Sequence, residues 1–153
     1  MPQNNLVRTP FTVDKNTEGV TYASTDLAGT ATQQQLLKYS IPLGLVVEIT
    51  PANYLFGEFY GTGGVTAADI IASGQTIIEK RNATGAASRE IWKGSNGIFG
   101  DIGDELKRPR FKTTVQVNAS QQIVVNVINM ATTLDVSTSN FYLEANQIFE
   151  DLA

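Results

Sequence analysis

The sequence predicts an all-β fold: a single jelly-roll-like or related β-sandwich or barrel domain with an extended N-terminal arm. Two observations support this prediction. After Gln33, short runs of β-branched and aromatic residues are separated by Gly, Pro, Asn and Ser, which is typical of a sandwich or barrel. Before that point the chain has few large aliphatic residues and many Thr, Asn and Gln. We therefore expect an arm at residues 1–33 and a β-sandwich domain at residues 34–153.

The arm carries its apolar residues singly, so it cannot form a core of its own. Isolated apolar side chains on an extended polar segment are typical of anchors that enter pockets on a neighbour, as when a strand adds to a sheet edge. This predicts that the arm binds a partner through Leu6, Val7, Phe11 and Val13. The alternative is a flexible terminus without a contact.

About eight strands are expected in the domain, with Pro42 and Pro51 at strand boundaries, where a missing amide hydrogen is tolerated. Residues 121–130 are apolar on one face and mixed on the other, which predicts contacts on both faces. Asn118-Ala119-Ser120 is expected to form a hairpin turn, and Thr66–Ser73 a short helix that Gly74 ends. The expected strands are Leu36–Ile41, Leu45–Thr50, Tyr54–Tyr60, Gln75–Lys80, Ser88–Lys93, Phe111–Val117, Ile123–Met130 and Phe141–Phe149.

The composition excludes most catalytic layouts. Among 153 residues there is no Cys and no His, so the chain has no thiolate nucleophile, no imidazole base and none of the common zinc ligand sets. We expect no enzyme activity and no cofactor. The formal net charge of −4 argues against nucleic acid as a partner, because nucleic-acid binders neutralise phosphates with Lys and Arg.

No membrane span and no signal peptide are expected. The sequence has no apolar run of about 18 residues, and its first ten residues lack a charged-then-apolar pattern. The chain is therefore expected to be soluble and made in the cytosol.

A glycine-rich segment, residues 94–105, predicts a long loop that displays Ile98, Phe99 and Ile102. Apolar residues on such a loop are typical of a contact surface, and the alternative is that they fold back onto the core. The basic run at residues 107–112 follows directly. Its Arg108 and Arg110 are expected to bind an acidic patch on a partner protein, or else to pair with the neighbouring acids Asp101, Asp104 and Glu105.

Other sites are weighed against plain structural roles. Gly61–Thr66 lacks the spacing and the lysine of a phosphate-binding loop, so a turn is expected. The acids of residues 101–105 do not match a calcium loop. A carboxylate hydrolase would need two facing acids among those three, Glu58 and Glu90. A sugar-binding platform would use aromatic residues that core packing also explains: Tyr54, Phe56, Phe59, Tyr60 and Trp92.

As an arrangement, an arm rich in Thr, Asn and Gln followed by a compact β domain without His or Cys resembles the head-decoration (cement) proteins of long-tailed bacteriophages. The similarity is greatest to the trimeric kind from phages of thermophilic hosts. It extends from Met1 to the last expected strand at Phe149 and is not carried by a motif.

The resemblance implies a homotrimer on the exterior of a phage capsid, made in the host cytoplasm and bound to the major capsid protein. The arms would clasp neighbouring subunits and stabilise the shell. The alternatives are a carbohydrate-binding β-sandwich module and a minor tail component.

Overall fold

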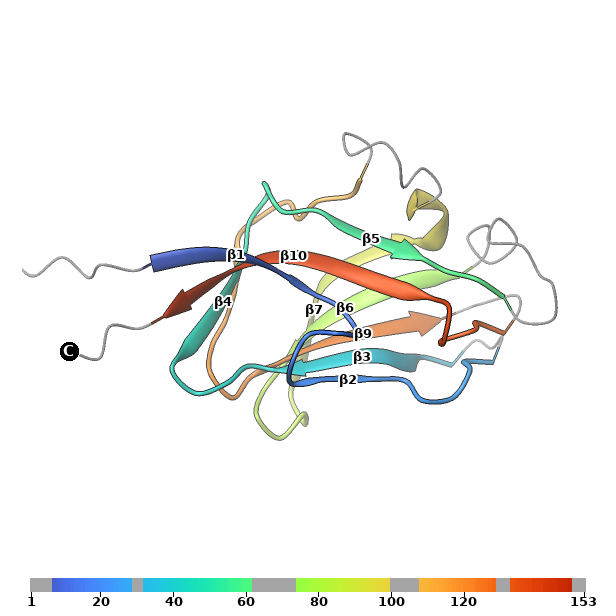
Figure 1. Ribbon diagram of the computed structural model, residues 1–153, viewed down its shortest axis with the longest axis horizontal. Helices are drawn as coiled ribbons and strands as arrows, with labels where there is room; N and C mark the ends of the chain where they lie inside the picture. Colours follow the sequence, from blue (N-terminus) through green and yellow to red (C-terminus); the bar gives the residue numbers. More distant parts are fainter. Residues whose placement is uncertain (1–6, 29–31, 62–73, 100–107, 129–132, 150–153) are drawn as a thin grey trace, which may run out of the picture.

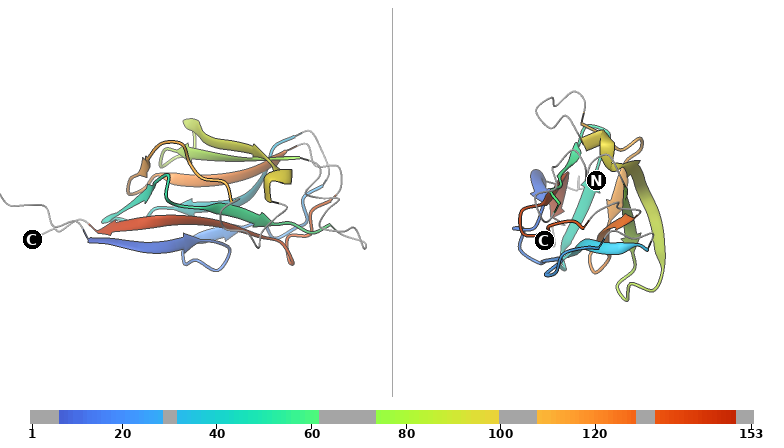
Figure 2. Two further views of the ribbon diagram at one scale, coloured as in Figure 1. Left: turned by 90° about the horizontal axis from the view of Figure 1, so that it is seen from above. Right: turned by 90° about the vertical axis from the view of Figure 1, so that its right-hand side faces the viewer.

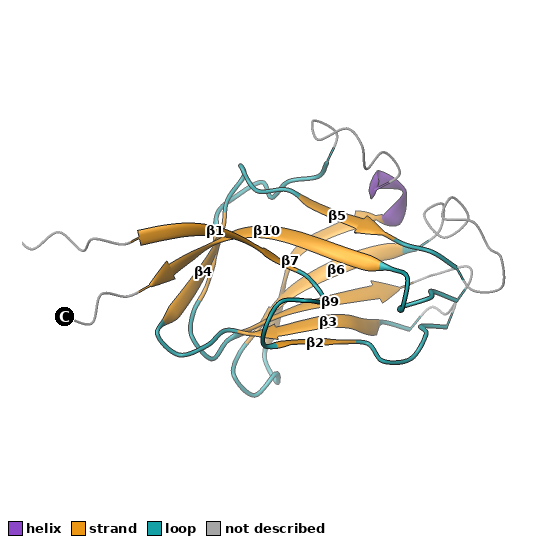
Figure 3. Cartoon of the chain, viewed as in Figure 1, coloured by secondary structure: helices purple, strands orange, loops and turns teal. Residues whose placement is uncertain are grey.

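Two antiparallel sheets face each other in the computed structural model (Figure 1), which describes residues 7–28, 32–61, 74–99, 108–128 and 133–149. Colouring by secondary structure shows strands throughout and one short 3-10 helix, η1 (Asn96–Phe99) (Figure 3). Seen along its long axis, the molecule shows the two sheets as separate layers (Figure 2). The predicted all-β sandwich is confirmed.

Sheet A has β10 as its central strand. Its strand order is β1-β10-β4-β8, and β5 also pairs with β10. The early part of β10 pairs with β5 and its end pairs with β4, so these two short strands act as halves of one interrupted strand. The bounds are β1 Val7–Val13, β4 Leu45–Ile49, β5 Leu55–Glu58, β8 Val115–Val117 and β10 Asn140–Phe149.

Sheet B has the strand order β2-β3-β9-β6-β7. Its central strand β9 is buried on both faces, as the sequence predicts: Ile123, Val125 and Val127 join the core, and Val124 on the other face is 0% exposed. The bounds are β2 Val20–Tyr22, β3 Gln34–Ser40, β6 Gln75–Arg81, β7 Ser88–Ser95 and β9 Gln122–Ile128.

The connections give the jelly-roll-like order. When β4 and β5 count as one strand and the three-residue β2 counts as an addition to the edge, eight strands remain of the ten described. When these eight strands are numbered 1 to 8 along the chain, their spatial order is 1-8-3-6 in sheet A and 2-7-4-5 in sheet B. Each sheet therefore combines strands from both ends of the chain, as in a double Greek key.

The described part of the predicted arm belongs to the domain. β1 pairs with β10 over its full length, from Val7↔Phe149 to Val13↔Leu143, and β2 pairs with β3. Val13 is fully buried in the core, and Leu27 is buried against it as well. This corrects the expectation of an arm separate from the domain: the scattered apolar residues fill the gap between the sheets of their own chain. Residues 1–6 and 29–31 lie outside the described residues.

Residues 118–121 do not form the predicted hairpin. They make a tight turn in which the amide of Gln121 donates to the carbonyl of Asn118, with Ser120 in the left-handed region at a φ of 68°. The turn also exchanges backbone hydrogen bonds with Ile41, so it passes the chain from β8 in sheet A to β9 in sheet B. The expected helix at residues 66–73 lies outside the described residues.

The core is built around three phenylalanines from different parts of the chain. Phe99 of η1 contacts Phe59 and Phe141 edge to face, at ring-centroid distances of 5.8 Å and 6.3 Å. Trp92 stacks on Phe99 from β7 at 6.0 Å. The two nearest atoms to a Cβ added at Gly57 would be ring atoms of Phe59 at 2.8 Å and 2.9 Å, so a glycine is required there. These rings connect β10 and the end of β5 in sheet A with β7 in sheet B.

The burial of Val13 yields a prediction that separates a core role from a partner-binding role. Val13→Ala should lower the free energy of unfolding of the isolated protein by about 2 kcal/mol, because it leaves a cavity between the sheets. Thr12→Ala, at the exposed neighbour on β1, should change it by less than about 0.5 kcal/mol. Urea unfolding followed by tryptophan fluorescence measures both, and equal stability of the two variants would contradict the core role.

The contact between Gly57 and Phe59 yields a second prediction. Gly57→Ala should destabilise the protein by about 1–3 kcal/mol, because the fully buried Phe59 ring cannot move away from the added methyl group. Adding Phe59→Leu to Gly57→Ala should cost less than the sum of the two single changes, since the clash disappears with the ring. Thermal unfolding of the single and double variants checks this, and strict additivity would speak against the clash.

Candidate partner-binding surfaces

A groove on the open side of the sandwich is lined by both charged and aromatic side chains. It lies between β7, the edge strand of sheet B, and residues 110–113, which lead into β8 at the edge of sheet A. Its volume is about 270 Å³. We call it the β7 groove, and its lining residues are Glu90, Ile91, Trp92, Lys93, Arg110, Phe111, Lys112 and Thr113.

The β7 groove combines an apolar floor with a positive rim. Phe111 is 3% exposed and, with the half-buried Trp92, belongs to the rings that pack on the core. Around them stand three exposed cations, Lys93, Arg110 and Lys112, against one carboxylate, Glu90. A groove with this lining favours an extended acidic segment that also carries apolar side chains.

Arginines and aromatic rings form two stacks beside this groove. The Arg110 guanidinium lies 4.2 Å from the ring centre of Tyr54 and donates a hydrogen bond to its hydroxyl. Arg108 lies 4.2 Å from the ring centre of Phe56, which stacks at 4.6 Å on Tyr142. A guanidinium held against a ring in this way loses little further freedom when it binds an anion.

The two arginines of the predicted partner site are thus brought close together, but the apolar residues predicted beside them are not a single surface. Ile98 is 47% exposed, whereas Phe99 is 2% exposed and belongs to the core. Phe99 therefore folds back onto the core, which is the alternative to display on a loop. Ile102 and the acids at residues 101–105 lie outside the described residues.

The predicted arm site is also divided. Val13 is buried in the core, and Phe11 is half-buried with its ring 6.3 Å from that of Tyr39, so both contact their own chain. Val7 is paired with Phe149 at the start of β1, and Leu6 lies outside the described residues. Of the predicted arm site, only Leu6 and Val7 at the start of β1 remain a predicted surface for a partner.

Sequence reasoning missed two strongly exposed apolar residues, Leu43 (85% exposed) and Phe149 (51% exposed). Leu43 precedes β4, and Phe149 ends β10, where it pairs with Leu45. In Figure 1 this end of β1 and β10 extends past the ends of β2 and β3. Along β10 the buried apolar positions Phe141, Leu143 and Ala145 alternate regularly, but Gln147 breaks this pattern, and the last buried residue is Ile148. The exposure of Phe149 therefore follows from the tertiary arrangement of the strand end.

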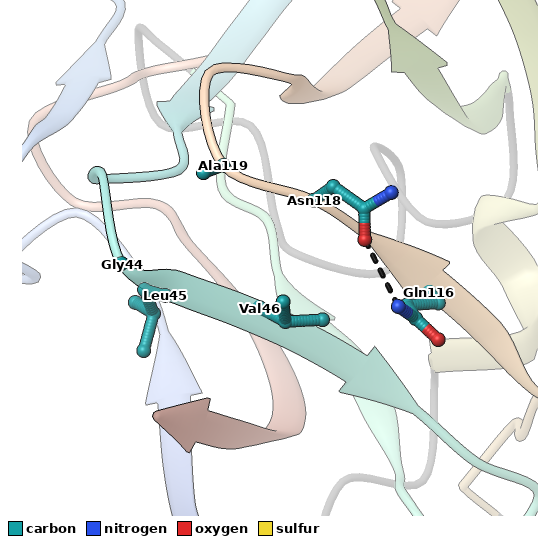
Figure 4. A pocket seen from close by; sticks show the side chains of 6 residues that line it. All are labelled: Gly44, Leu45, Val46, Gln116, Asn118 and Ala119. Carbon is teal, nitrogen blue, oxygen red and sulfur yellow. Dashed lines mark hydrogen bonds between the residues drawn. The ribbon is translucent and has the colours of Figure 1, made fainter. Parts of the chain in front are cut away.

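A second hollow lies beside that end. It has a volume of about 440 Å³ and is bordered by β4 and by the β8 end of the turn to β9. Figure 4 shows its lining side chains, with the Gln116 amide donating to the Asn118 side-chain oxygen at 2.9 Å. The lining has no charged group and consists of small, apolar or amide residues, so it offers shape but little to hold an ion.

Three tyrosines, Tyr22, Tyr39 and Tyr142, have raised pKa values. Burial is the main cause of the raised pKa of Tyr22, with a smaller effect from Tyr142; the Tyr22 hydroxyl donates to the Ser139 carbonyl at 2.7 Å. Burial is also the main cause at Tyr142, where Glu58 and Asp14 raise the pKa further, and at Tyr39, where Glu18 does so. With raised pKa values these phenols stay neutral well into the alkaline range, and the Tyr22 hydroxyl acts as a hydrogen-bond donor.

The alternative sites receive little support from the described residues. Glu58 lies on β5 of sheet A and Glu90 on β7 of sheet B, and only Glu90 lines the β7 groove, so the two carboxylates do not face each other across it. Of the aromatic residues of the predicted sugar platform, Phe59 is fully buried and the Phe56 ring is covered by Arg108 and Tyr142, whereas Trp92 is half-buried and lines the β7 groove. Within the described ranges no three acidic side chains gather as metal ligands, and no helix found there is long and apolar enough to cross a membrane.

The buried Tyr22 yields a prediction on alkaline stability. Because the folded state raises its pKa, the stabilisation is fully present below about pH 10, the ordinary tyrosine value, and is lost as the pH rises from there towards the folded pKa. Tyr22→Phe should cost about 1 kcal/mol at neutral pH through the lost hydrogen bond, and should lose less stability than the wild type between pH 9 and about pH 11. Urea unfolding at both pH values measures this, and parallel pH profiles would contradict it.

Comparison with known proteins identifies the fold. No family model matches the sequence, and no curated protein matches it. Among solved structures, the chain is similar to VP17, a capsid protein of bacteriophage P23-77, with a TM-score of 0.67 and 8% identity over 95% of this chain and 97% of that one. It is similar as well to a chain of the VP16-VP17 complex of the two major capsid proteins of that phage, with a TM-score of 0.64 and 9% identity over 92% of this chain and 98% of that one. At these identities the comparison shows a shared fold.

Proposed function

We propose that this chain is a structural protein of a bacteriophage virion and that it forms part of the capsid shell. The observation that carries the proposal is the extent of the similarity to VP17, which includes 95% of this chain and 97% of that capsid protein. One of the similar structures is a complex of two major capsid proteins, which supports another capsid protein as the partner.

The surface chemistry supports a structural role as well. The described carboxylates do not converge on a cleft, and the tyrosines with raised pKa values are neutral near pH 7. The chain also lacks the imidazole and thiol groups that most catalytic sites use. Its low charged fraction of 17% suits contacts that form without the desolvation of many ions.

Two positions in the shell are compatible with this role. From the resemblance to head-decoration proteins, we propose a trimer on the outside of the capsid, bound to the major capsid protein and clasping its neighbours through residues near Leu6 and Val7. The similarity to major capsid proteins supports the other position, in which the chain is a building block of the shell itself.

Virus particles provide the test of the virion role. Particles from cultures that carry this gene should be banded in a density gradient, treated with protease-free nuclease and analysed by quantitative mass spectrometry. We expect the chain in the DNA-containing band at a copy number comparable to that of the main shell proteins. Its absence from the particles would overturn the proposal, and a few copies per particle would instead indicate a minor tail component.

Dissociation of the same particles distinguishes the two positions. A decoration protein should be released by mild denaturant while the shell remains intact in electron micrographs, whereas loss of a building block should dissolve the shell. Antibodies to the chain should label the outer surface of intact particles in either case. The mass of the released protein in solution then tests the trimer directly.

A further inference from the structure

We propose that the β7 groove is a docking site for a second copy of this chain, which enters with residues 149–152 at the end of its β10. This inference rests on the proposed function, because it names the partner of a shell protein. It depends on three observations: the lining of the groove, the chemistry of the segment at the end of β10, and the distance between the two within one copy.

The groove fits an acidic segment with apolar side chains. Lys93, Arg110 and Lys112 surround an apolar floor and outnumber the single carboxylate, Glu90. The contacts of Arg110 with the ring and the hydroxyl of Tyr54 already orient its guanidinium group. A carboxylate of the incoming segment would therefore find the N–H donors of this group held in place. The outer edge of β7 has no strand beside it in the described part of the chain, so this side of the sandwich is open.

The end of β10 carries the complementary chemistry. Phe149 is half exposed although it belongs to a strand, and the sequence continues with Glu150, Asp151 and Leu152. The two acids of this segment lie between two large apolar residues. Their charge is opposite to that of the three cations around the groove, and the apolar side chains suit its apolar floor. The tip of β10 also stands clear of sheet B in Figure 1, where a neighbouring molecule can reach it.

The geometry excludes the groove of the same copy. Tyr54 accepts a hydrogen bond from the amide of Glu144, so the groove is level with Glu144, five positions before Phe149 on β10. Five positions correspond to about 17 Å along the strand, and Arg110 lies a further two strand spacings of about 4.8 Å to the side. Asp151, two residues beyond Phe149, is at most about 7 Å from it along the chain, so its carboxylate reaches only the groove of another copy.

Such a contact is head-to-tail, because the donating tip and the accepting groove are different surfaces. Contacts of this kind form closed rings or continue as open arrays, depending on the rotation between copies. Both outcomes suit a protein that covers an extended shell. The charges make the contact sensitive to salt, since exposed ion pairs at a rim are screened at high ionic strength.

Charge exchange between the two surfaces tests the inference. The tip variant is Glu150→Lys with Asp151→Lys, and the groove variant is Lys93→Glu with Lys112→Glu. Sedimentation velocity of the purified full chain should show concentration-dependent association of the wild type at low salt. Each variant alone should associate at least about tenfold more weakly, because like charges then meet at the contact.

Mixing the two variants is the decisive measurement. In an equimolar mixture the reversed tip of one variant meets the reversed groove of the other, and the two unchanged surfaces also match, so association should return. A matched control, Glu18→Lys, reverses an exposed acid in the turn between β1 and β2 and should associate like the wild type. Circular dichroism of each variant confirms that the fold is retained.

Three results would overturn the inference. The first is a wild-type chain that stays monomeric up to about 100 μM, because a contact with a higher dissociation constant would not assemble the chain on its own. The other two are variants that associate like the wild type and an equimolar mixture whose association does not return. These results are independent of the virion test. A chain found in particles without self-association would retain the proposed function and lose this contact, whereas a self-associating chain absent from particles would do the reverse.

Discussion

The pairing of β1 with β10 is the interaction on which the rest of the structure depends. Seven consecutive residue pairs join the first described strand to the last one, and β10 in turn carries β4 and β5 on its other side. Because β1 leads through a tight turn into β2 at the edge of sheet B, the same pairing also holds the two sheets together along one side. The opposite side is held by rings instead, with Phe99 between Phe59, Phe141 and Trp92. The molecule is thus closed by backbone hydrogen bonds on one side and by aromatic packing on the other, and it is on the second side that the β7 groove lies.

Much of the fold could be predicted from local patterns, and the errors have physical causes. Strands such as β6, β9 and β10 were recognisable because their alternation or their continuous apolar runs reflect burial within a sheet. The role of residues 7–28 was not, because Val13 acquires a core only when β10 lies beside β1, and Leu27 only when Leu134 lies beside it, in each case more than a hundred residues later in the chain. The turn at residues 118–121 looked like a hairpin for the same reason: a tight turn is equally able to connect two strands of one sheet or to cross between sheets, and the choice is made by its hydrogen bonds to the distant Ile41.

The candidate site was predicted in part. The basic run drew attention to Arg108 and Arg110, and both stand on rings at one side of the molecule. Lys93, which completes the rim of the groove, comes from β7 and stands seventeen positions before Arg110 in the sequence, so no motif spacing connects the two. Phe99 was ambiguous between display and burial, and the aromatic contacts of its ring resolve it in favour of burial. Surfaces made of residues from several strands are generally invisible to motif reasoning, because the sheet and not the chain sets their spacing.

Pro10 in the middle of β1 has a consequence for how the protein behaves when it is crowded. β1 is an edge strand, and Pro10 lies opposite Asn146 without an amide hydrogen to offer on either side. An incoming strand would find the donor row of this edge interrupted at its centre, which disfavours fibre growth through backbone pairing. A chain protected in this way can be packed at very high local density while its contacts with neighbours are still decided by side chains.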